Sequence, residues 1–389
     1  MRLLILDGDS NVGLAVLQSL GRRGYRCCVA SNHAKYPAQW SRYASETAVC
    51  PHPLRERQAF EAWILDFQRA RRFDLILPVM ETTLIPLHGL RETPELRGVV
   101  ALPPADAVEV AFDKEKLRRL AVSLGVPTPG TLFLERPDPA ALDAWLKELP
   151  VVVKAVRSKV WGAGGGHMVA SVARSADVAR AAVERLLRVS PVQVQRWVPG
   201  RGMGVEVLVS HGRIVMAFAH RRLHESLKTV PPATYREAVE PPPPLLAAAS
   251  RILERLAWHG VAMVEFRVDE AGGRSWLLEI NGRFWGSLPL AIHAGADFPV
   301  ALVEMWLTGR EPAPYRQNGR FYARNVVQDL LWTKENLKTI RLLPTLLEWA
   351  RVLSGREAWD GASWRDPLPF VRELLVALGR RFGRLSSNP

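Results

Sequence analysis

The first hundred residues alternate between short apolar runs and segments whose apolar residues recur at helical spacing. The apolar runs 2–7, 25–31 and 73–79 read as strands, each closed by glycine, serine or proline. Val12, Val16 and Leu20 follow the first run at helical spacing, and residues 57–70 show the same period. Strands that alternate with helices predict a parallel sheet with helices on both faces. We place this α/β unit at residues 1–105.

Polar residues follow two of these predicted strands. In such sheets, ligands bind beyond the carboxyl ends of the strands. The two loops therefore supply five candidate substrate contacts: Asp9, Ser10, Asn11, Glu81 and Thr82. Ordinary helix capping by Ser10 or Asn11 explains part of this pattern equally well. The glycines of the first loop do not complete G-x-G-x-x-G, which argues against a dinucleotide site.

The middle of the chain reads as hairpins and helices. A helix is expected from Asp113 to Gly125, and strands at 149–156 and 192–198. Hairpins are expected around residues 210–212 and 271–273, with a helix between them that begins after the prolines near 241. The last 70 residues have apolar positions at helical spacing, so we expect a mainly helical region over 311–389.

Composition limits the class of protein. Hydrophobic residues make up 48% and charged residues 23%, which is typical of a globular chain. Three cysteines fit neither a metal spacing nor a disulfide framework, so a cytoplasmic protein is expected. The net charge of +13 favours anionic partners. The arginines are spread along the chain, however, and a solvated basic surface explains them as well.

The segment 276–286, WLLEINGRFWG, presents Glu279, Asn281 and Arg283 at every second position. A strand would place these three side chains on one face. A three-residue loop at 271–273 would set Glu265 nearly opposite Glu279. Opposed strand residues have β-carbons about 5 Å apart, and like charges there repel. Either one carboxyl group is protonated or a cation lies between them, and two carboxylates with an amide oxygen suit Mg²⁺.

A glycine-rich loop and a lysine supply a second feature. The loop contains Gly162, Gly164, Gly165 and Gly166. Without β-carbons, its backbone amides could wrap phosphate oxygens, although a flexible turn is the plainer alternative. Lys154 lies on a strand of valines, where burial is costly unless the ammonium meets an anion. The alternative is that its side chain reaches the surface.

The order of lysine, glycine-rich loop and opposed carboxylates on β-hairpins resembles the ATP-grasp superfamily. It is similar to the branch of biotin carboxylase and the carbamoyl-phosphate synthetase large chain. The resemblance covers residues 110–305 and rests on FDKEKLRRLAVSLGVPTPGT, PVVVKAVRSKVWGAGGGHM, VQRWVPGRGMGVEVLV and MVEFRV with WLLEINGRFWGSLPLAI. It implies a pre-ATP-grasp α/β domain at 1–105. A two-subdomain ATP-grasp domain, split near 195–200, would follow at 106–310.

The resemblance also implies roles for single residues. Lys114 and Lys154 would contact the phosphates of ATP, and the loop Gly162–His167 would close over them. Glu206 would hold the ribose. Adenine would be lined by Gln195, Arg196, Trp197 and Val198.

The chemical centre is implied in the same way. Glu265, Glu279 and Asn281 would hold Mg²⁺, or Mn²⁺ in its place. Arg283 would lie on the reacting carboxylate or its phosphate, and Arg283 and Lys154 would be the catalytic residues. The implied reaction joins a carboxylate to an amine through an acyl-phosphate, with release of ADP and phosphate. A bicarbonate-using carboxylase of the same fold is the alternative within the enzyme class.

One segment departs from the family pattern. Relatives often carry glycines after the second central hairpin, on a loop that touches substrate. Here the segment carries prolines and Lys228. Arg221, Arg222 and Lys228 are candidate clamps for an anionic substrate.

Other classes remain as alternatives. A non-catalytic nucleotide-binding protein is one, and relatives of this family commonly form homodimers. No nucleic-acid-binding module is recognisable. The terminal helix could contact an anionic membrane, or pack on its own domain. Its basic residues are Arg372, Arg380, Arg381 and Arg384, with Phe370, Leu374, Leu378 and Phe382 on another side.

Overall fold

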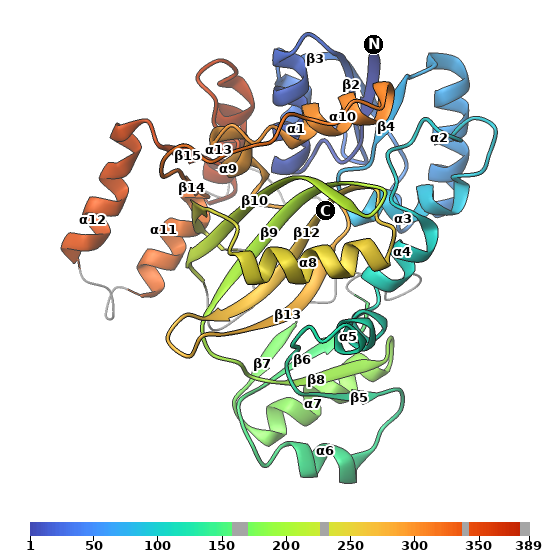
Figure 1. Cartoon of the computed structure of the whole chain (residues 1–389). Helices are drawn as coiled ribbons and strands as arrows, with labels where there is room; N and C mark the ends of the chain where they lie inside the picture. The colour runs from blue at the N-terminus through green and yellow to red at the C-terminus, as the bar shows by residue number, and fades with distance from the viewer. Residues whose placement is uncertain (158–169, 226–232, 337–341, 382–389) are drawn as a thin grey trace.

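The computed structural model describes residues 1–157, 170–225, 233–336 and 342–381, and it contains three β-sheets (Figure 1). The glycine-rich loop Gly162–His167 and Lys228 lie outside the described residues. Arg384 and Phe382 lie outside them as well. Among the described helices, none combines the length and the hydropathy that crossing a bilayer requires.

The first sheet is parallel and has the order β3-β2-β1-β4, as the alternating pattern predicts. Its strands are β1 (Arg2–Ile5), β2 (Arg26–Ser31), β3 (Ala44–Val49) and β4 (Leu75–Leu77), and its helices are α1 (Asn11–Arg22), α2 (Arg57–Arg71) and α3 (Glu81–Leu90). The sequence analysis missed β3. Alternate residues of this edge strand are exposed, and it contains few large apolar side chains.

The seven-stranded sheet has the order β13-β12-β9-β10-β11-β14-β15 and forms the centre of the molecule. Its strands are β9 (Arg201–Ser210), β10 (Arg213–His224), β11 (Tyr235–Val239), β12 (Gly260–Asp269), β13 (Arg274–Asn281), β14 (Tyr322–Arg324) and β15 (Glu357–Trp359). Helix α8 (Pro243–Arg255) packs on one face through Leu245 and Ile252. On the other face, α9 (Leu288–His293) and α10 (Phe298–Thr308) also contact α1, so one apolar core joins the first two sheets.

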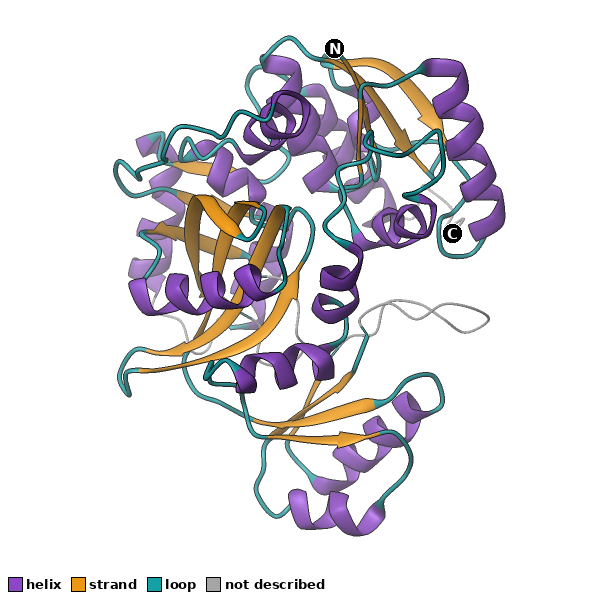
Figure 2. Cartoon of the chain, turned by 45° about the vertical axis from the view of Figure 1, so that its right-hand side comes forward, coloured by secondary structure: helices purple, strands orange, loops and turns teal. Residues whose placement is uncertain are grey.

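The third sheet is antiparallel and small, and it extends away from the other two (Figure 2). It has the order β5-β8-β6-β7, with β5 (Thr131–Leu134), β6 (Val151–Ala155), β7 (Ser171–Ala173) and β8 (Val192–Arg196). Helices α6 (Pro139–Trp145) and α7 (Ala176–Leu187) complete its core. Two helices, α4 (Ala105–Ala111) and α5 (Lys114–Ser123), precede it. Asp113 caps α5, because its carboxylate accepts from the amides of Glu115 and Lys116.

The C-terminal region is mainly helical, as expected, but it also contributes two short strands that the sequence analysis missed. Helices α11 (Val326–Glu335), α12 (Leu342–Ala350) and α13 (Leu368–Arg381) are present, but β14 and β15 extend the central sheet. Strands of three residues contain too few positions for a period of two to appear in the sequence. The C-terminal residues are therefore part of the central sheet.

A buried arginine anchors these added strands. Arg324 has no exposed surface, and its guanidinium lies 3.7 Å from the ring centre of Tyr235 and 4.2 Å from that of Trp349. Its Nε donates to Glu357 at 2.9 Å, and its Nη1 donates to Asp329. Each carboxylate comes from a different element, so the arginine ties β14 to β15 and to α11.

We expect Arg324→Met to lower the free energy of unfolding by roughly 3–5 kcal/mol, because two buried carboxylates would lose their counter-ion. Urea denaturation measures the loss, and hydrogen exchange should show it in β14 and β15. Arg213→Met is the matched control, since Arg213 pairs with Glu311 at the surface. Equal effects of the two substitutions would contradict this role for Arg324.

Candidate active site

The predicted pairing of Glu265 with Glu279 is confirmed. Strands β12 and β13 are antiparallel, and these two glutamates are direct partners in the register. The turn contains four residues, 270–273, rather than the three expected. A β-bulge between Glu265 and Phe266 compensates, because Phe266 pairs with Leu277 and leaves Leu278 as the extra residue.

The bulge also changes which apolar side chains are buried. Leu277 and Ile280 both lie in the core beneath α8, whereas Leu278 is half-exposed. Simple alternation would have placed Leu278 and Ile280 together. Beyond the bulge, Glu279 and Asn281 share the opposite face, where they meet the carboxylate of Glu265.

Cationic groups surround the two carboxylates. Lys114 Nζ lies 3.8 Å from Glu279, and Arg222 Nη2 lies 2.8 Å from Glu265. Asn281 donates to Glu279 at 3.3 Å and accepts from Arg283 Nη2 at 2.9 Å. The structure therefore brings Asn281 and Arg283 to the carboxylate pair.

The two glutamates differ in their protonation. Burial raises the pKa of Glu265, Arg222 opposes that rise, and the neighbouring Glu279 adds to it. Burial alone would also raise the pKa of Glu279, but the ammonium groups of Lys114 and Lys154 outweigh burial and lower it. A third of the Glu279 side chain is exposed, so solvent weakens these effects. Glu279 is therefore more readily ionised than Glu265.

Lys154 is buried on β6, with 8% of its surface exposed. Its pKa is lowered from 10.5 to about 8: burial is the largest cause, Lys114 acts in the same direction, and Glu279 and Glu265 oppose the shift. No described residue accepts a hydrogen bond from its ammonium group. A buried lysine in this state would gain from an anionic ligand.

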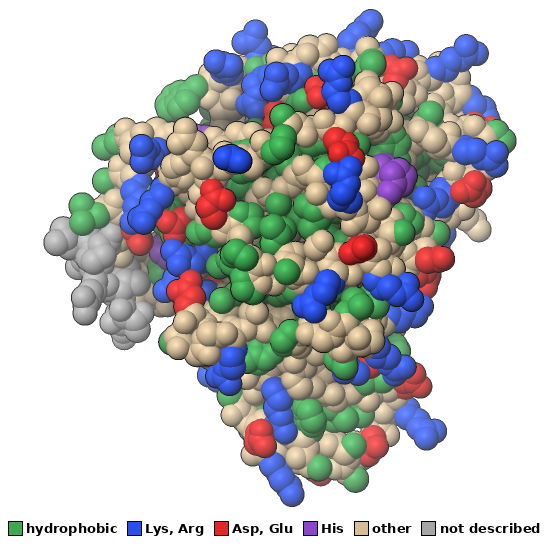
Figure 3. Space-filling model, in the orientation of Figure 1, with side chains coloured by type: hydrophobic (Ala, Val, Ile, Leu, Met, Phe, Trp, Pro, Cys, Tyr) green, Lys and Arg blue, Asp and Glu red, His purple; other side chains and the backbone are tan. Residues whose placement is uncertain are grey.

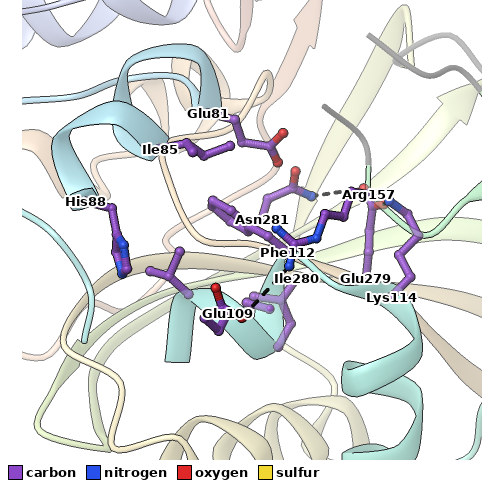
Figure 4. A pocket seen from close by; sticks show the side chains of 12 residues that line it. Glu81, Ile85, His88, Glu109, Phe112, Lys114, Arg157, Glu279, Ile280 and Asn281 are labelled. Carbon is purple, nitrogen blue, oxygen red and sulfur yellow. Dashed lines mark hydrogen bonds and ion pairs between the residues drawn. The ribbon is translucent and has the colours of Figure 1, made fainter. Parts of the chain in front are cut away.

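A pocket opens beside Glu279 and Asn281 (Figure 4). Glu81 from α3 and Asn281 from β13 both point into it, so the first α/β unit forms one wall of the pocket. Ile85 of α3 makes that wall partly apolar, and Val108 and Phe112 at α4 continue the apolar lining. The remaining lining residues are His88, Glu109, Ala111, Lys114, Arg157, Glu279 and Ile280. The sequence analysis missed Arg157, His88 and Glu109, because no motif marks them and only folding brings them to this place.

The candidate contacts of the first loop lie elsewhere. Ser10 caps α1 by accepting from the amide of Gly13, as the capping alternative predicts, and Asn11 is the first residue of that helix. Asp9 accepts from Ser31 at 2.8 Å. None of the three lines the pocket.

Asp7 is the polar residue that organises this edge of the sheet, and the sequence analysis missed it. Its carboxylate accepts from the amides of Val79 and Met80 and from the hydroxyls of Thr82 and Thr83. Burial raises its pKa to about 6 although these hydrogen bonds oppose the rise. Thr82 therefore helps to fix the first turn of α3, which carries Glu81. An acidic residue directly at a strand end was the signal that could have revealed Asp7.

The residues expected around adenine lie at the end of β8. Gln195 lines a second small cavity with Lys114, Leu277 and Leu278. The backbone N–H of Arg196 already donates to Gly130, and its side chain lies over Trp145. Trp197 packs against Arg267, and Val198 is half-exposed.

Glu206 has no exposed surface with which to contact a ribose. It bonds His220, and Ser287 Oγ donates to it at 3.1 Å. A β-carbon at Gly204 would lie 2.5 Å from the His220 ring, so this glycine leaves room for the histidine ring to lie over the neighbouring strand β9. Glu206 is thus sealed within the central sheet in this structure, and its ribose role stays a prediction.

The two arginines expected to clamp substrate point in different directions, because successive strand residues face opposite sides. Arg222 reaches Glu265, and Arg221 pairs with Glu237 and Glu270 instead. Over the face shown in Figure 3, lysines and arginines are scattered rather than gathered in one patch. Arg222 is therefore the one of the two that belongs to the candidate active site.

Known proteins share this architecture. A family model described as "ATP-grasp in the biosynthetic pathway with Ter operon" matches residues 188–327. The D-alanine–D-alanine ligase of Gloeobacter violaceus is 31% identical over 221 residues, which cover 51% of this chain and 70% of that ligase. The chain belongs to the ATP-grasp family. It is thus a member of a family of ATP-dependent ligases.

Other similar proteins cover less of their own length or share less sequence. This ATP-grasp chain is 31% identical over 159 residues to the formate-dependent phosphoribosylglycinamide formyltransferase of Mycolicibacterium gilvum, covering 40% of the chain and 37% of that enzyme. Among solved structures, the L-amino acid ligase of Bacillus licheniformis aligns over 82% of the chain and 78% of its own, with a TM-score of 0.62 and 17% identity. The biotin carboxylase of Campylobacter jejuni aligns over 82% of this chain and 74% of its own, with a TM-score of 0.66 and 16% sequence identity. The predicted ATP-grasp fold is confirmed.

We expect Lys154→Met to stabilise the free protein at pH 7. The folded-state pKa of about 8 lies below the ordinary 10.5, so the unfolded chain binds more protons and stability rises with pH between these values. A difference of 2.5 pKa units corresponds to a cost on the order of 3 kcal/mol below pH 8. Thermal unfolding at pH 7 and pH 10 should show a higher Tm for the variant at pH 7 and a smaller rise with pH.

Lys116→Met is the control for that measurement, since Lys116 is exposed and pairs with Glu109. A lower Tm for Lys154→Met at pH 7 would show that the buried ammonium stabilises the free protein.

Proposed function

We propose that the chain is an ATP-dependent carboxylate–amine ligase. It forms an amide through an acyl-phosphate and releases ADP and phosphate. The observation that carries the proposal is the opposed pair Glu265 and Glu279, with Lys114 and Lys154 close enough to change the pKa of Glu279. Such a set can hold a divalent cation and a triphosphate together.

The donor set fits Mg²⁺ or Mn²⁺. Glu265, Glu279 and Asn281 offer hard oxygen atoms from one face of a hairpin, and magnesium typically takes few protein ligands and completes its shell with water and phosphate. Among the described residues there is no cluster of three His, Cys, Asp or Glu side chains that could hold a metal, so a site made only of such residues is not found. The bound cation would neutralise charge on the transferred phosphoryl group.

The basic residues then have separate tasks. Lys114 and Lys154 bind ATP phosphates. At pH 8 a fraction of Lys154 is neutral, and this fraction takes up a proton when the triphosphate binds. Arg283, held by Asn281, orients the substrate carboxylate toward the γ-phosphate. Catalysis in this scheme consists of positioning and electrostatic stabilisation, and no protein nucleophile takes part.

The pocket wall formed by α3 and α4 receives the second substrate. Glu81 and Ile85 of α3 offer a carboxylate to an ammonium group and apolar contact, and Val108 and Phe112 at α4 add apolar contact. The three free cysteines and the dependence on ATP fit the cytoplasm, which is the compartment we propose.

The first test is phosphate release from magnesium-ATP with pooled amino acids and other small carboxylates. Wild-type protein should release phosphate only with a matching pair of substrates. Glu279→Gln should lower kcat at least a hundredfold, since a lost charge in such a centre costs several kcal/mol of transition-state stabilisation. Glu270→Gln on the same hairpin turn is the control and should retain activity. Equal rates for wild type and Glu279→Gln would refute the metal assignment.

The second test separates the amine site from the ATP site. Glu81→Gln should raise the KM for the amine about tenfold, because an ammonium loses a charged partner worth roughly 1.5 kcal/mol or more. The KM for ATP should not change, and the acyl-phosphate should still be trapped by hydroxylamine. A loss of trapped acyl-phosphate in Glu81→Gln would assign Glu81 to the first half-reaction instead.

A further inference from the structure

The outward side of α13 and the turn before it carry exposed apolar side chains. Trp364 is fully exposed, and Leu368, Val371 and Leu375 are 46%, 45% and 55% exposed. Residues 368, 371 and 375 are three and four apart, so they lie on one face of the helix. This face is not the one expected from the sequence, since Phe370 is half-buried on the inner side.

In this part of the chain, most basic side chains are exposed and the acidic side chains are buried or half-buried. In the described stretch 351–375, the exposed charged side chains are all arginines: Arg356, Arg365 and Arg372. Three of the four acidic groups turn inward, and the fourth, Glu373, is half-buried. Asp360 pairs with Arg236, Asp366 accepts from Ser41 and Gln18, and Glu357 holds Arg324.

We propose that Trp364, Arg365, Leu368, Val371, Arg372 and Leu375 form a surface that binds an anionic membrane. We call these six residues the α13 surface. Leucine and valine would enter the interface, tryptophan would lie at headgroup level, and the two arginines would pair with lipid phosphates. The inference is independent of the proposed reaction, because the α13 surface contributes nothing to the pocket at Glu279.

The charges favour a membrane over a second copy of this chain. In a two-fold interface the same patch meets itself, so Arg365 and Arg372 would face the same arginines of the other copy. An anionic bilayer instead supplies opposite charge to both arginines and an apolar phase to the three aliphatic side chains. Helix α13 is in contact with residues 37–40, and the exposed Arg372 guanidinium lies 5.5 Å from the ring centre of Trp40, so the helix has a fixed orientation.

The test is co-sedimentation of the full chain with vesicles of phosphatidylcholine and phosphatidylglycerol in a two-to-one ratio. Wild-type protein should sediment with these vesicles and not with pure phosphatidylcholine. About 1 M salt, which shortens the screening length to about 3 Å, should release it. The double variant Val371→Asp, Leu375→Asp should bind at least about tenfold more weakly, since both positions are exposed and the change costs no core packing.

The matched control is Val178→Asp on α7, where the valine is 53% exposed. It should sediment as wild type does, and circular dichroism should show all three proteins folded.

The proposal is overturned if wild type stays in the supernatant with anionic vesicles, or if the double variant binds as well as the control. A concentration-dependent dimer that the double variant abolishes, without vesicle binding by wild type, would assign the α13 surface to self-association and overturn the membrane proposal. ATP hydrolysis by the double variant should equal that of wild type, which separates this outcome from any failure of the ligase assignment.

Discussion

Two carboxylates, of Glu265 on β12 and Glu279 on β13, face each other and repel. The other residues of the site reduce or use this repulsion. In water such a pair would separate or take up a proton. Here the sheet holds Glu265 and Glu279 in register, and cations approach from three sides: Lys114 and Lys154 toward one glutamate, Arg222 toward the other. The pair is tolerable because it is partly neutralised, and it remains able to take a divalent ion.

The central sheet makes this arrangement possible by having two different faces. The face beneath α8 is apolar where the helix packs on it, with Val205, Val264 and Leu277 in its core. The other face is apolar at one end, where it packs on α9 and α10, and polar at the end that carries Glu279 and Arg222. The bulge at Leu278 serves both faces, because it keeps the strand buried below while it turns Glu279 toward Glu265.

The C-terminal residues extend the central sheet through β14 and β15, and they also carry the α13 surface on the outside of the molecule. Arg324 and its carboxylate partners fix β14 and β15 to the core, and they leave no acid among the exposed charges of residues 351–375. The burial of the acidic side chains thus accounts for both the inward ion pairs and the outward arginines. Buried acids need cations beside them, and the arginines that are not needed for this purpose remain at the surface.

The parallel α/β unit, the hairpins and the opposition of Glu265 and Glu279 could be predicted from the amino-acid sequence, because strand and helix periods and short turns are local. The sequence could not show β14 and β15, since three residues carry no period, or the bulge that compensates for the four-residue turn. Tertiary structure alone decided that Glu81 meets Asn281 across the pocket and that Glu206 is sealed beneath His220. It also decided that Leu368 rather than Phe370 faces outward. Such contacts join residues far apart in the chain, and only packing chooses among them.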